Sequence, residues 1–254
     1  MSIQVLDTAE RGIRRAVTRN GLVLMAVLFV IGLATALVDL GLDRLVVFDP
    51  ADPAAVEFVA PTLGASLLSL ALSVLGMVVV IGATRILVSD ETETLPREAF
   101  THRMGWAWLN VFVGTIVFAI LVAFGFVALI VPGFFLLVAL AFWTVFVAVE
   151  DQSFVAGMRS SWALTRGNRL SLFVLGLLMF VVGIGIGIAF GIVGFVGGTI
   201  ALVLGQAASA ISTVFGLAVL ATAYNTLRAT DDEESPEAPA ADPQTPGSGA
   251  TGGI

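Results

Sequence analysis

Long runs of apolar residues follow one another along the chain, separated by short polar segments or by glycine and proline. A helix rises about 1.5 Å per residue, so about 20 residues cross a hydrocarbon core of roughly 30 Å. Pro132-Gly133 interrupts one run, and Gly197-Gly198 interrupts the last and longest. The pattern predicts six transmembrane helices, at about 21–40, 63–88, 107–130, 134–150, 170–195 and 199–227.

Composition supports a membrane protein. The chain has 254 residues, of which 58% are hydrophobic and 12% are charged, and its mean hydropathy is +1.02. Soluble domains carry about 25% charged residues, so this chain has too little polar surface for water. We expect an all-α, polytopic membrane protein with six transmembrane helices plus one or two cytoplasmic interfacial amphipathic helices.

Residues 1–20 combine an apolar stripe with a cluster of arginines. Asp7 followed by Glu10 matches a capping box, in which two side chains accept backbone N–H groups at the start of a helix. Apolar residues recur at helical spacing on one side, namely Leu6, Ile13 and Val17. We interpret the segment as an amphipathic helix on the membrane surface, with arginines toward the headgroups. The alternative is a frayed basic tail that only fixes the topology.

The first apolar run also has features of a cleaved signal peptide. A basic region precedes it, and Ala34-Thr35-Ala36 resembles a cleavage site. The basic region is long, however, and the run reaches nearly the full length of a membrane span. These two features favour an uncleaved helix.

Arginine accounts for all twelve basic residues, and its distribution predicts the orientation. Six spans place both termini on one side, together with eleven of the arginines: Arg11, Arg14, Arg15, Arg19, Arg85, Arg97, Arg103, Arg159, Arg166, Arg169 and Arg228. The other side holds Arg44. Because cytoplasmic loops carry the excess of basic residues, we expect both termini on the cytoplasmic side of the cell membrane.

The chain ends in an acidic tail. Residues 229–254 hold six acids and four prolines and almost nothing large and apolar. Such a segment cannot bury a core, so we expect it to be disordered. The six-helix domain then spans 21–228. With nineteen acids, no lysine and a net charge of −7, the whole chain has a composition typical of a salt-loving archaeon.

An island of charge, "VEDQSFVAGMRSSWALTRGNRL", runs from 149 to 170 between two apolar runs. On a helical wheel, Phe154, Met158 and Trp162 fall on one broad face, and two arginines lie at its edge. The pattern predicts a helix lying in the membrane interface. Its candidate contacts with lipid headgroups are Arg159, Trp162, Arg166 and Arg169.

Glycines in the fifth predicted span form a regular stripe. They follow a spacing of four, four, three and four: Gly183, Gly187, Gly191, Gly194 and Gly198. Small residues at such spacing let a neighbouring helix approach closely, so we expect helix packing here. The alternative is a flexible, kinked helix that gates a pathway.

Uncharged polar residues in the last span share one helical face, formed by Gln206, Ser209 and Thr213. They could line a narrow polar path. Such residues more often hydrogen-bond between helices, and this is the reading that we favour.

Catalytic signatures are missing from the sequence. The chain has no cysteine and one histidine, and no cluster of residues has metal-ligand or triad spacing. We therefore expect neither an enzyme nor a cofactor, and the sequence shows no nucleic-acid-binding motif. A membrane enzyme would need Glu150, Arg159 and His102 to converge in one pocket.

The segment from the Pro-Gly break through the charged island resembles a six-helix membrane protein family. This family includes the membrane domain of some bacterial glycerophosphodiester phosphodiesterases and related stand-alone membrane proteins, some of them haloarchaeal. The matching positions are Pro132, Gly133, Glu150, Ala156, Arg159, Ser161, Trp162 and Gly167. One departure is that a glycine commonly follows the glutamate, where this chain has Asp151. The phosphodiesterase catalytic domain is missing from this chain, so the resemblance implies a fold and not that activity.

Two functions remain open at this point. The first, which the sequence favours, is a non-enzymatic scaffold or lipid-interacting module, with membrane lipids, other membrane proteins or a second copy as partners. The second is a channel or passive transporter with a polar path near Gln206. A continuous polar cavity reaching Gln206 would favour transport, whereas a dry, glycine-packed centre would favour the scaffold. Glu150 either pairs with an arginine, which is the reading that we favour, or faces a ligand.

Overall fold

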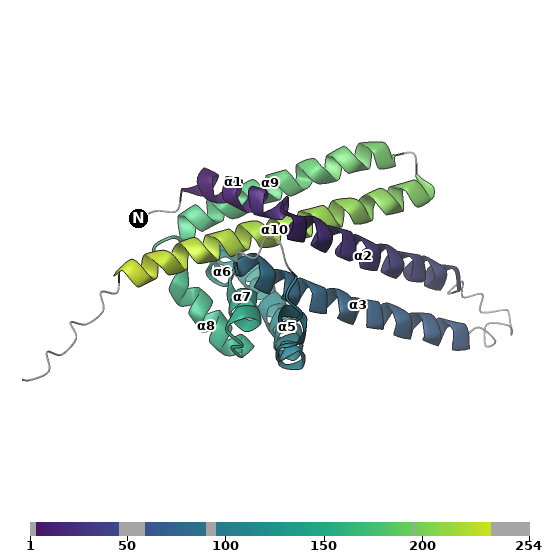
Figure 1. Ribbon diagram of the computed structural model, residues 1–254, viewed down its shortest axis with the longest axis horizontal. Helices are drawn as coiled ribbons and strands as arrows, with labels where there is room; N and C mark the ends of the chain where they lie inside the picture. The colour runs from purple at the N-terminus through teal and green to yellow at the C-terminus, as the bar shows by residue number, and fades with distance from the viewer. Residues whose placement is uncertain (1–3, 46–58, 90–94, 196, 235–254) are drawn as a thin grey trace, which may run out of the picture.

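The computed structural model describes residues 4–45, 59–89, 95–195 and 197–234, and every regular element in these ranges is an α-helix (Figure 1). The helices are α1 Val5–Ala16, α2 Arg19–Leu45, α3 Val59–Val88, α4 Glu98–Thr101, α5 Met104–Ala128, α6 Ile130–Ala139, α7 Trp143–Val149, α8 Phe154–Leu164, α9 Arg169–Gly194 and α10 Gly198–Glu234. The prediction of an all-α fold is confirmed.

Within the described residues, six stretches are long and apolar enough to cross a membrane, as the sequence predicts. Their bounds are Arg19–Gly41, Leu63–Val88, Met104–Ala128, Ile130–Val149, Arg169–Gly194 and Gly198–Asp231. The fourth stretch is not one helix, because α6 ends at Ala139 and α7 begins at Trp143. The acidic tail starts later than predicted, since α10 continues to Glu234; the rest of the tail lies outside the described residues.

Local backbone chemistry sets the breaks between spans. Leu129 is extended between α5 and α6, so the break precedes Pro132, which lies in the first turn of α6 where a helix does not need its N–H. At the predicted break between α9 and α10, Gly197 and Gly198 have φ values of 81° and 63°. Glycine adopts this left-handed region without a steric cost, so this part of the prediction is confirmed.

Two of the clusters of buried side chains join helices that are distant in the sequence. One joins α2, α3 and α10 around Leu24, Ala83 and Val214. The other places α7 against α9 and α10, with Phe142 and Tyr224 among its members. In Figure 1, α2, α3, α9 and α10 extend toward the right, while α5, α6, α7 and α8 lie together below α10.

Helix α1 is docked on α10. A Cβ at Gly12 would come within 2.6 Å of Val219 Cγ2, so only glycine permits this approach. Leu6 and Val17 remain 77% and 54% exposed on another face, which fits an amphipathic helix rather than a frayed tail. The capping box is wrong, because Gln4 is the N-cap and Asp7 lies inside the helix, paired with Arg11.

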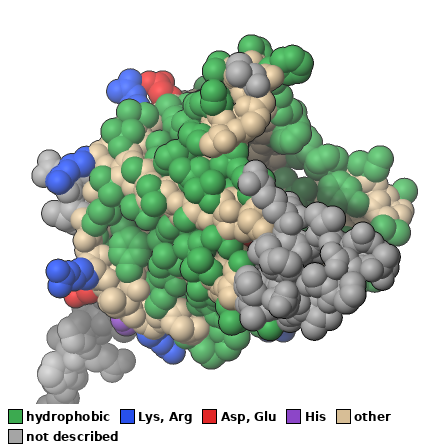
Figure 2. Space-filling model, turned by 90° about the vertical axis from the view of Figure 1, so that its right-hand side faces the viewer, with side chains coloured by type: hydrophobic (Ala, Val, Ile, Leu, Met, Phe, Trp, Pro, Cys, Tyr) green, Lys and Arg blue, Asp and Glu red, His purple; other side chains and the backbone are tan. Residues whose placement is uncertain are grey.

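The outer surface of the bundle is largely apolar. Exposed side chains include Phe124 at 70%, Val127 at 85% and Phe195 at 94%. Figure 2 shows hydrophobic side chains spread over one face, with arginines along its margin. This surface would be unstable in water and matches the hydrocarbon core of a bilayer.

Candidate functional site

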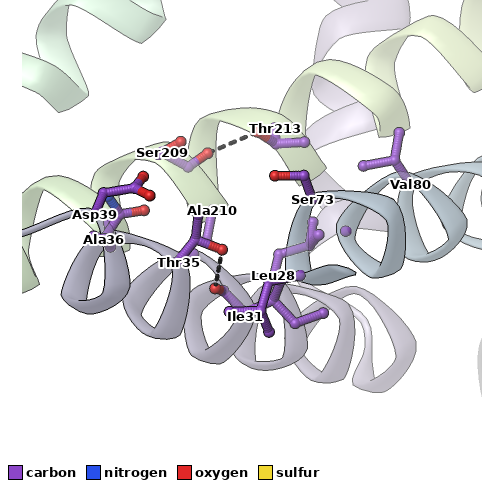
Figure 3. A pocket seen from close by; sticks show the side chains of 14 residues that line it. Leu28, Ile31, Thr35, Ala36, Asp39, Ser73, Val80, Ser209, Ala210 and Thr213 are labelled. Carbon is purple, nitrogen blue, oxygen red and sulfur yellow. Dashed lines mark hydrogen bonds between the residues drawn. The ribbon is translucent and has the colours of Figure 1, made fainter. Parts of the chain in front are cut away.

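A cavity of about 310 Å³ lies between α2, α3 and α10 (Figure 3). Its lining combines apolar and polar side chains: Leu28, Ile31, Gly32, Thr35, Ala36, Asp39, Leu72, Ser73, Gly76, Val80, Gln206, Ser209, Ala210 and Thr213. We call it the polar cavity. All three residues of the polar face predicted on the last span line it, so the face is directed at a cavity rather than at a tightly packed neighbour.

Gln206 and Gly32 meet across the polar cavity. A Cβ at Gly32 would lie 2.6 Å from Gln206 Oε1, so the glycine leaves the room that the amide occupies. The hydroxyl of Thr35 donates to Ile31 O at 2.9 Å, and that of Thr213 donates to Ser209 O at 2.8 Å. These bonds use the hydroxyl protons and leave oxygen lone pairs for a solute.

Asp39 adds a carboxylate to the polar cavity. Its Oδ1 accepts a hydrogen bond from Ser69 Oγ at 2.7 Å. The first span was predicted to end at about residue 40, but α2 runs on to Leu45, so Asp39 lies within a helix and lines the polar cavity. In the part of the chain that the structure describes, no three His, Cys, Asp or Glu side chains gather closely enough to hold a metal ion.

A second constellation involves the charged island, at the end of α7. Glu150 Oε1 forms a salt bridge with Arg228 and accepts a hydrogen bond from the Tyr224 hydroxyl at 2.6 Å. Its Oε2 accepts from Gln152 Nε2 at 2.8 Å. We call this group the clasp. Glu150 therefore pairs with an arginine, which was the reading favoured from the sequence.

Asp151 explains the departure from the family pattern. Its φ is 52°, a left-handed conformation that glycine adopts freely and that aspartate tolerates better than most residues. The side chain accepts from Arg85 at 3.4 Å and lies 3.0 Å from His102 Nε2. Trp106 Nε1 donates to the Asp151 carbonyl at 3.3 Å. These three partners hold the turn that a glycine would form without them.

Arg85 ties the same turn to the rest of the protein. It donates to the carbonyls of Ala148, Ala99 and His102, so it caps α7 and anchors α4. The sequence identified Asp151 as a departure from the resembled pattern and counted Arg85 toward the orientation, but it did not predict the contact between them. Glu150, Arg159 and His102 do not converge in one pocket, because Glu150 joins Arg228, His102 joins Asp151 and Arg159 is exposed.

Ser161 hydrogen-bonds with the backbone groups that are left unpaired between α6 and α7. Its hydroxyl donates to Ala139 O at 3.0 Å and accepts from Phe142 N at 3.0 Å. Thr165 Oγ1 also reaches Ala139 O, at 3.3 Å. Backbone groups freed by a broken helix must find other partners inside a membrane protein. Ser161 supplies them, which gives this position of the resemblance a structural role.

Other positions of the resemblance also have structural roles. A Cβ at Gly133 would meet the Phe126 ring at 2.5 Å, so glycine allows α5 and α6 to pack as a tight hairpin. Gly167 has φ of 81° just after α8, where a left-handed residue ends the helix. The backbone N–H of Ala156 donates to Ser153 Oγ at 3.3 Å, so Ser153 caps the start of α8.

The face of α8 predicted to lie in lipid packs largely on protein. Phe154, Met158 and Trp162 pack around Leu140, Trp143 and Val147. The helical wheel identified the apolar face of α8 correctly. This face packs against α7, whereas the prediction placed it against lipid.

The four predicted headgroup contacts divide into two pairs. Arg159 and Arg166 are exposed. The Arg169 guanidinium lies 4.6 Å from the ring centroids of both Trp162 and Phe135 and donates to Trp162 O at 3.3 Å. Cation–π contacts of this kind fasten α9 to α6 and α8, so Arg169 and Trp162 have a packing role in this chain.

The glycine stripe of α9 does not pack against another helix of the chain. A Cβ at Gly183, Gly187, Gly191 or Gly198 would meet no described atom within 4 Å, and only Gly194 approaches a neighbour, with Ala201 Cα at 3.4 Å. The prediction of close packing within the chain is therefore wrong for most of the stripe. Regular spacing makes a close approach feasible but supplies no partner.

Fold and sites together define the class: an all-α, multi-pass membrane protein with six helices able to span the bilayer and a broken fourth span. A family model described as a domain of unknown function (DUF7847) matches residues 3–227, and the chain belongs to that family. No match was found among curated proteins or among solved structures.

Proposed function

We propose that this membrane protein provides a narrow passage or binding site for a small polar solute in the polar cavity. The single observation that carries the proposal is the convergence of Asp39, Ser73 and Gln206, from three helices, on one open cavity between apolar helices. Polar and ionisable groups are costly inside a bilayer, and in known membrane proteins they mark solute and ion pathways.

The cavity favours a passage over a scaffold. A scaffold needs only packed apolar helices, and a dry centre would fill the space between α2, α3 and α10. Instead Gln206 lies against Gly32, where a side chain larger than glycine would displace its amide. A volume of about 310 Å³ accommodates several water molecules, each with a share of about 30 Å³, and so fits a solute of a few heavy atoms.

The orientation and kinship are part of the same proposal. The arginine distribution supports a cell-membrane protein with both termini in the cytoplasm. The residues shared with the membrane domain of glycerophosphodiester phosphodiesterases, such as Glu150, Ser161 and Gly167, have structural roles here. They support a common fold, and the protein acts without catalysing a reaction.

Transport can be measured with purified full-length protein in liposomes. Stopped-flow light scattering would follow osmotic volume changes with urea, glycerol and ammonium chloride as probes. We expect the protein to accelerate entry of at least one probe over empty liposomes. Rates equal to those of empty liposomes for all three would refute a passage.

Two glycine variants provide a matched comparison. Gly32→Leu fills the polar cavity beside Gln206, whereas Gly187→Leu places the same side chain in open space on α9. We expect Gly32→Leu to lower the accelerated flux about tenfold and Gly187→Leu to preserve it. Gln206→Leu removes the amide without a backbone clash and should also lower the flux. Equal flux in wild type, Gly32→Leu and Gln206→Leu would exclude this route.

A further inference from the structure

A second polar pocket, of about 550 Å³, lies between α1 and α10 and is separate from the polar cavity. Three arginines of α1 form one wall and polar or small residues of α10 form the other: Arg11, Arg14, Arg15, Thr222, Asn225, Thr226, Ala229 and Thr230. We call it the basic pocket. All three charged groups that line it are cationic.

The arginines of the basic pocket are held close together. Arg15 donates to Leu87 O at 2.6 Å, which fixes its guanidinium at the end of α3. Burial lowers the pKa of Arg15, and the neighbouring charge of Arg11 lowers it further. An anion between these groups would relieve their repulsion.

Within the described residues, Arg11 and Arg14 each form an ion pair along α1. Arg11 pairs with Asp7 at 2.9 Å and Arg14 with Glu10 at 2.8 Å, both one turn away on α1 with side chains at least half exposed. Exposed pairs of this kind contribute little and exchange readily for a better partner. A phosphate group can accept hydrogen bonds from several N–H donors at once. A single carboxylate one turn away on the same helix accepts fewer of them.

The α10 wall of the basic pocket is polar as well. Thr222, Thr226 and Thr230 place hydroxyl groups on one face, each donating to the carbonyl four residues earlier. Asn225 Nδ2 donates to Val88 O at 3.0 Å and keeps its second N–H for another acceptor.

The surroundings of the basic pocket indicate the source of the anion. Leu6 of α1 and Val17, directly after the helix, are exposed, so this segment presents apolar side chains next to its arginines. Such a helix lies at the boundary between acyl chains and headgroups. A phosphate held by α1 is therefore at the depth of a phospholipid headgroup.

We propose that the basic pocket between α1 and α10 binds a phosphate group, supplied by an anionic phospholipid of the surrounding membrane. Free inorganic phosphate has the same chemistry and is the other source. The proposal does not depend on transport through the polar cavity, because the two sites share no lining residue.

Native mass spectrometry of the full-length protein in detergent tests the proposal. Three probes distinguish the sources: phosphatidylglycerol, phosphatidylcholine and inorganic phosphate. We expect phosphatidylglycerol to bind in preference to phosphatidylcholine, without competition from millimolar phosphate. Strong competition would instead identify free phosphate as the ligand. Equal binding of both lipids without competition by phosphate would overturn the proposal.

Charge variants locate the site. Each arginine near an anionic surface strengthens binding about fivefold, so Arg11→Gln/Arg14→Gln should weaken phosphatidylglycerol binding about 25-fold. The matched control Arg97→Gln/Arg103→Gln removes the same charge from exposed positions on either side of α4, outside the basic pocket, and should weaken binding clearly less. Equal losses in the two double variants would refute a localised site.

A variant that keeps every charge separates the pocket from general surface attraction. Ala229→Trp fills the pocket from the α10 wall and leaves Arg11, Arg14 and Arg15 in place. We expect it to weaken phosphatidylglycerol binding at least about tenfold, with an unchanged melting temperature. Unchanged binding would show that the lipid does not enter the pocket.

Discussion

The clasp offers a direct test of how α10 is fixed to the charged island. Glu150→Gln removes the ion pair with Arg228 but keeps one oxygen, which can accept from either Tyr224 or Gln152. Arg228→Gln removes the other charge together with its contacts over the Phe146 and Tyr224 rings. The double variant Glu150→Gln/Arg228→Gln completes a double-mutant cycle.

The burial of the Glu150–Arg228 pair sets the loss of stability that we expect. The side chains of Glu150 and Arg228 are 25% and 44% exposed, so the pair lies between two limits. Exposed pairs contribute about 0–1 kcal/mol, and removal of one partner from a buried pair costs about 3–5 kcal/mol. We expect each single variant to lose about 1–2 kcal/mol and the pair to be coupled by about 1 kcal/mol.

Thermal unfolding in detergent, followed by tryptophan fluorescence, measures these losses. Trp143 is buried beside the charged island and reports its opening. For a chain of about 250 residues, 1 kcal/mol shifts the melting temperature by about 2–4 °C, so each single variant should melt about 3–6 °C lower. Arg159→Gln, at an exposed position on α8, is the control and should melt within about 2 °C of wild type.

The test depends on whether the stability losses of the two single variants add up in the double variant. If the ion pair holds the clasp together, the decrease in melting temperature in the double variant is much smaller than the sum of the decreases in the two single variants. Strictly additive losses would show that Glu150 and Arg228 act separately, and the structural role assigned to the pair would be wrong.

Three further predictions follow from packing. Gly187→Leu should leave the melting temperature unchanged within about 2 °C, because open space surrounds that face of α9; a large drop in detergent would reveal a packed neighbour. Ser161→Ala should cost about 1–3 kcal/mol in thermal unfolding, since Phe142 N and Ala139 O lose a partner. Gly12→Leu should displace α1 from α10 and speed trypsin cleavage in α1, whereas protection equal to wild type would contradict the docking.

Apolar patterning predicted the spans because hydrophobic length alone decides which segments cross a membrane. It placed the break at Gly197-Gly198 correctly, since left-handed backbone there needs glycine. It did not show that the fourth span is broken near Leu140, because the side chain that satisfies the break, Ser161, comes from a later helix.

Sites that join distant segments were harder to predict. Glu150 was a clear candidate, but nothing local identifies Arg228 among twelve arginines as its partner. Asp39 looked like the end of a span, and its place in the polar cavity depends on how α2, α3 and α10 meet. The stripe around Gly187 shows the opposite case, in which a regular local pattern had no neighbour to meet.

The clasp also constrains the order of biogenesis. Glu150 precedes Arg228 by 78 positions, and α9 and most of α10 lie between them. A ribosome therefore delivers Glu150 to the membrane before its partner exists, and the carboxylate stays unpaired until the last span has been synthesised and inserted. Closing the clasp is a late step of assembly, and a chain truncated before α10 would lack the sixth span and leave Glu150 without both Arg228 and Tyr224.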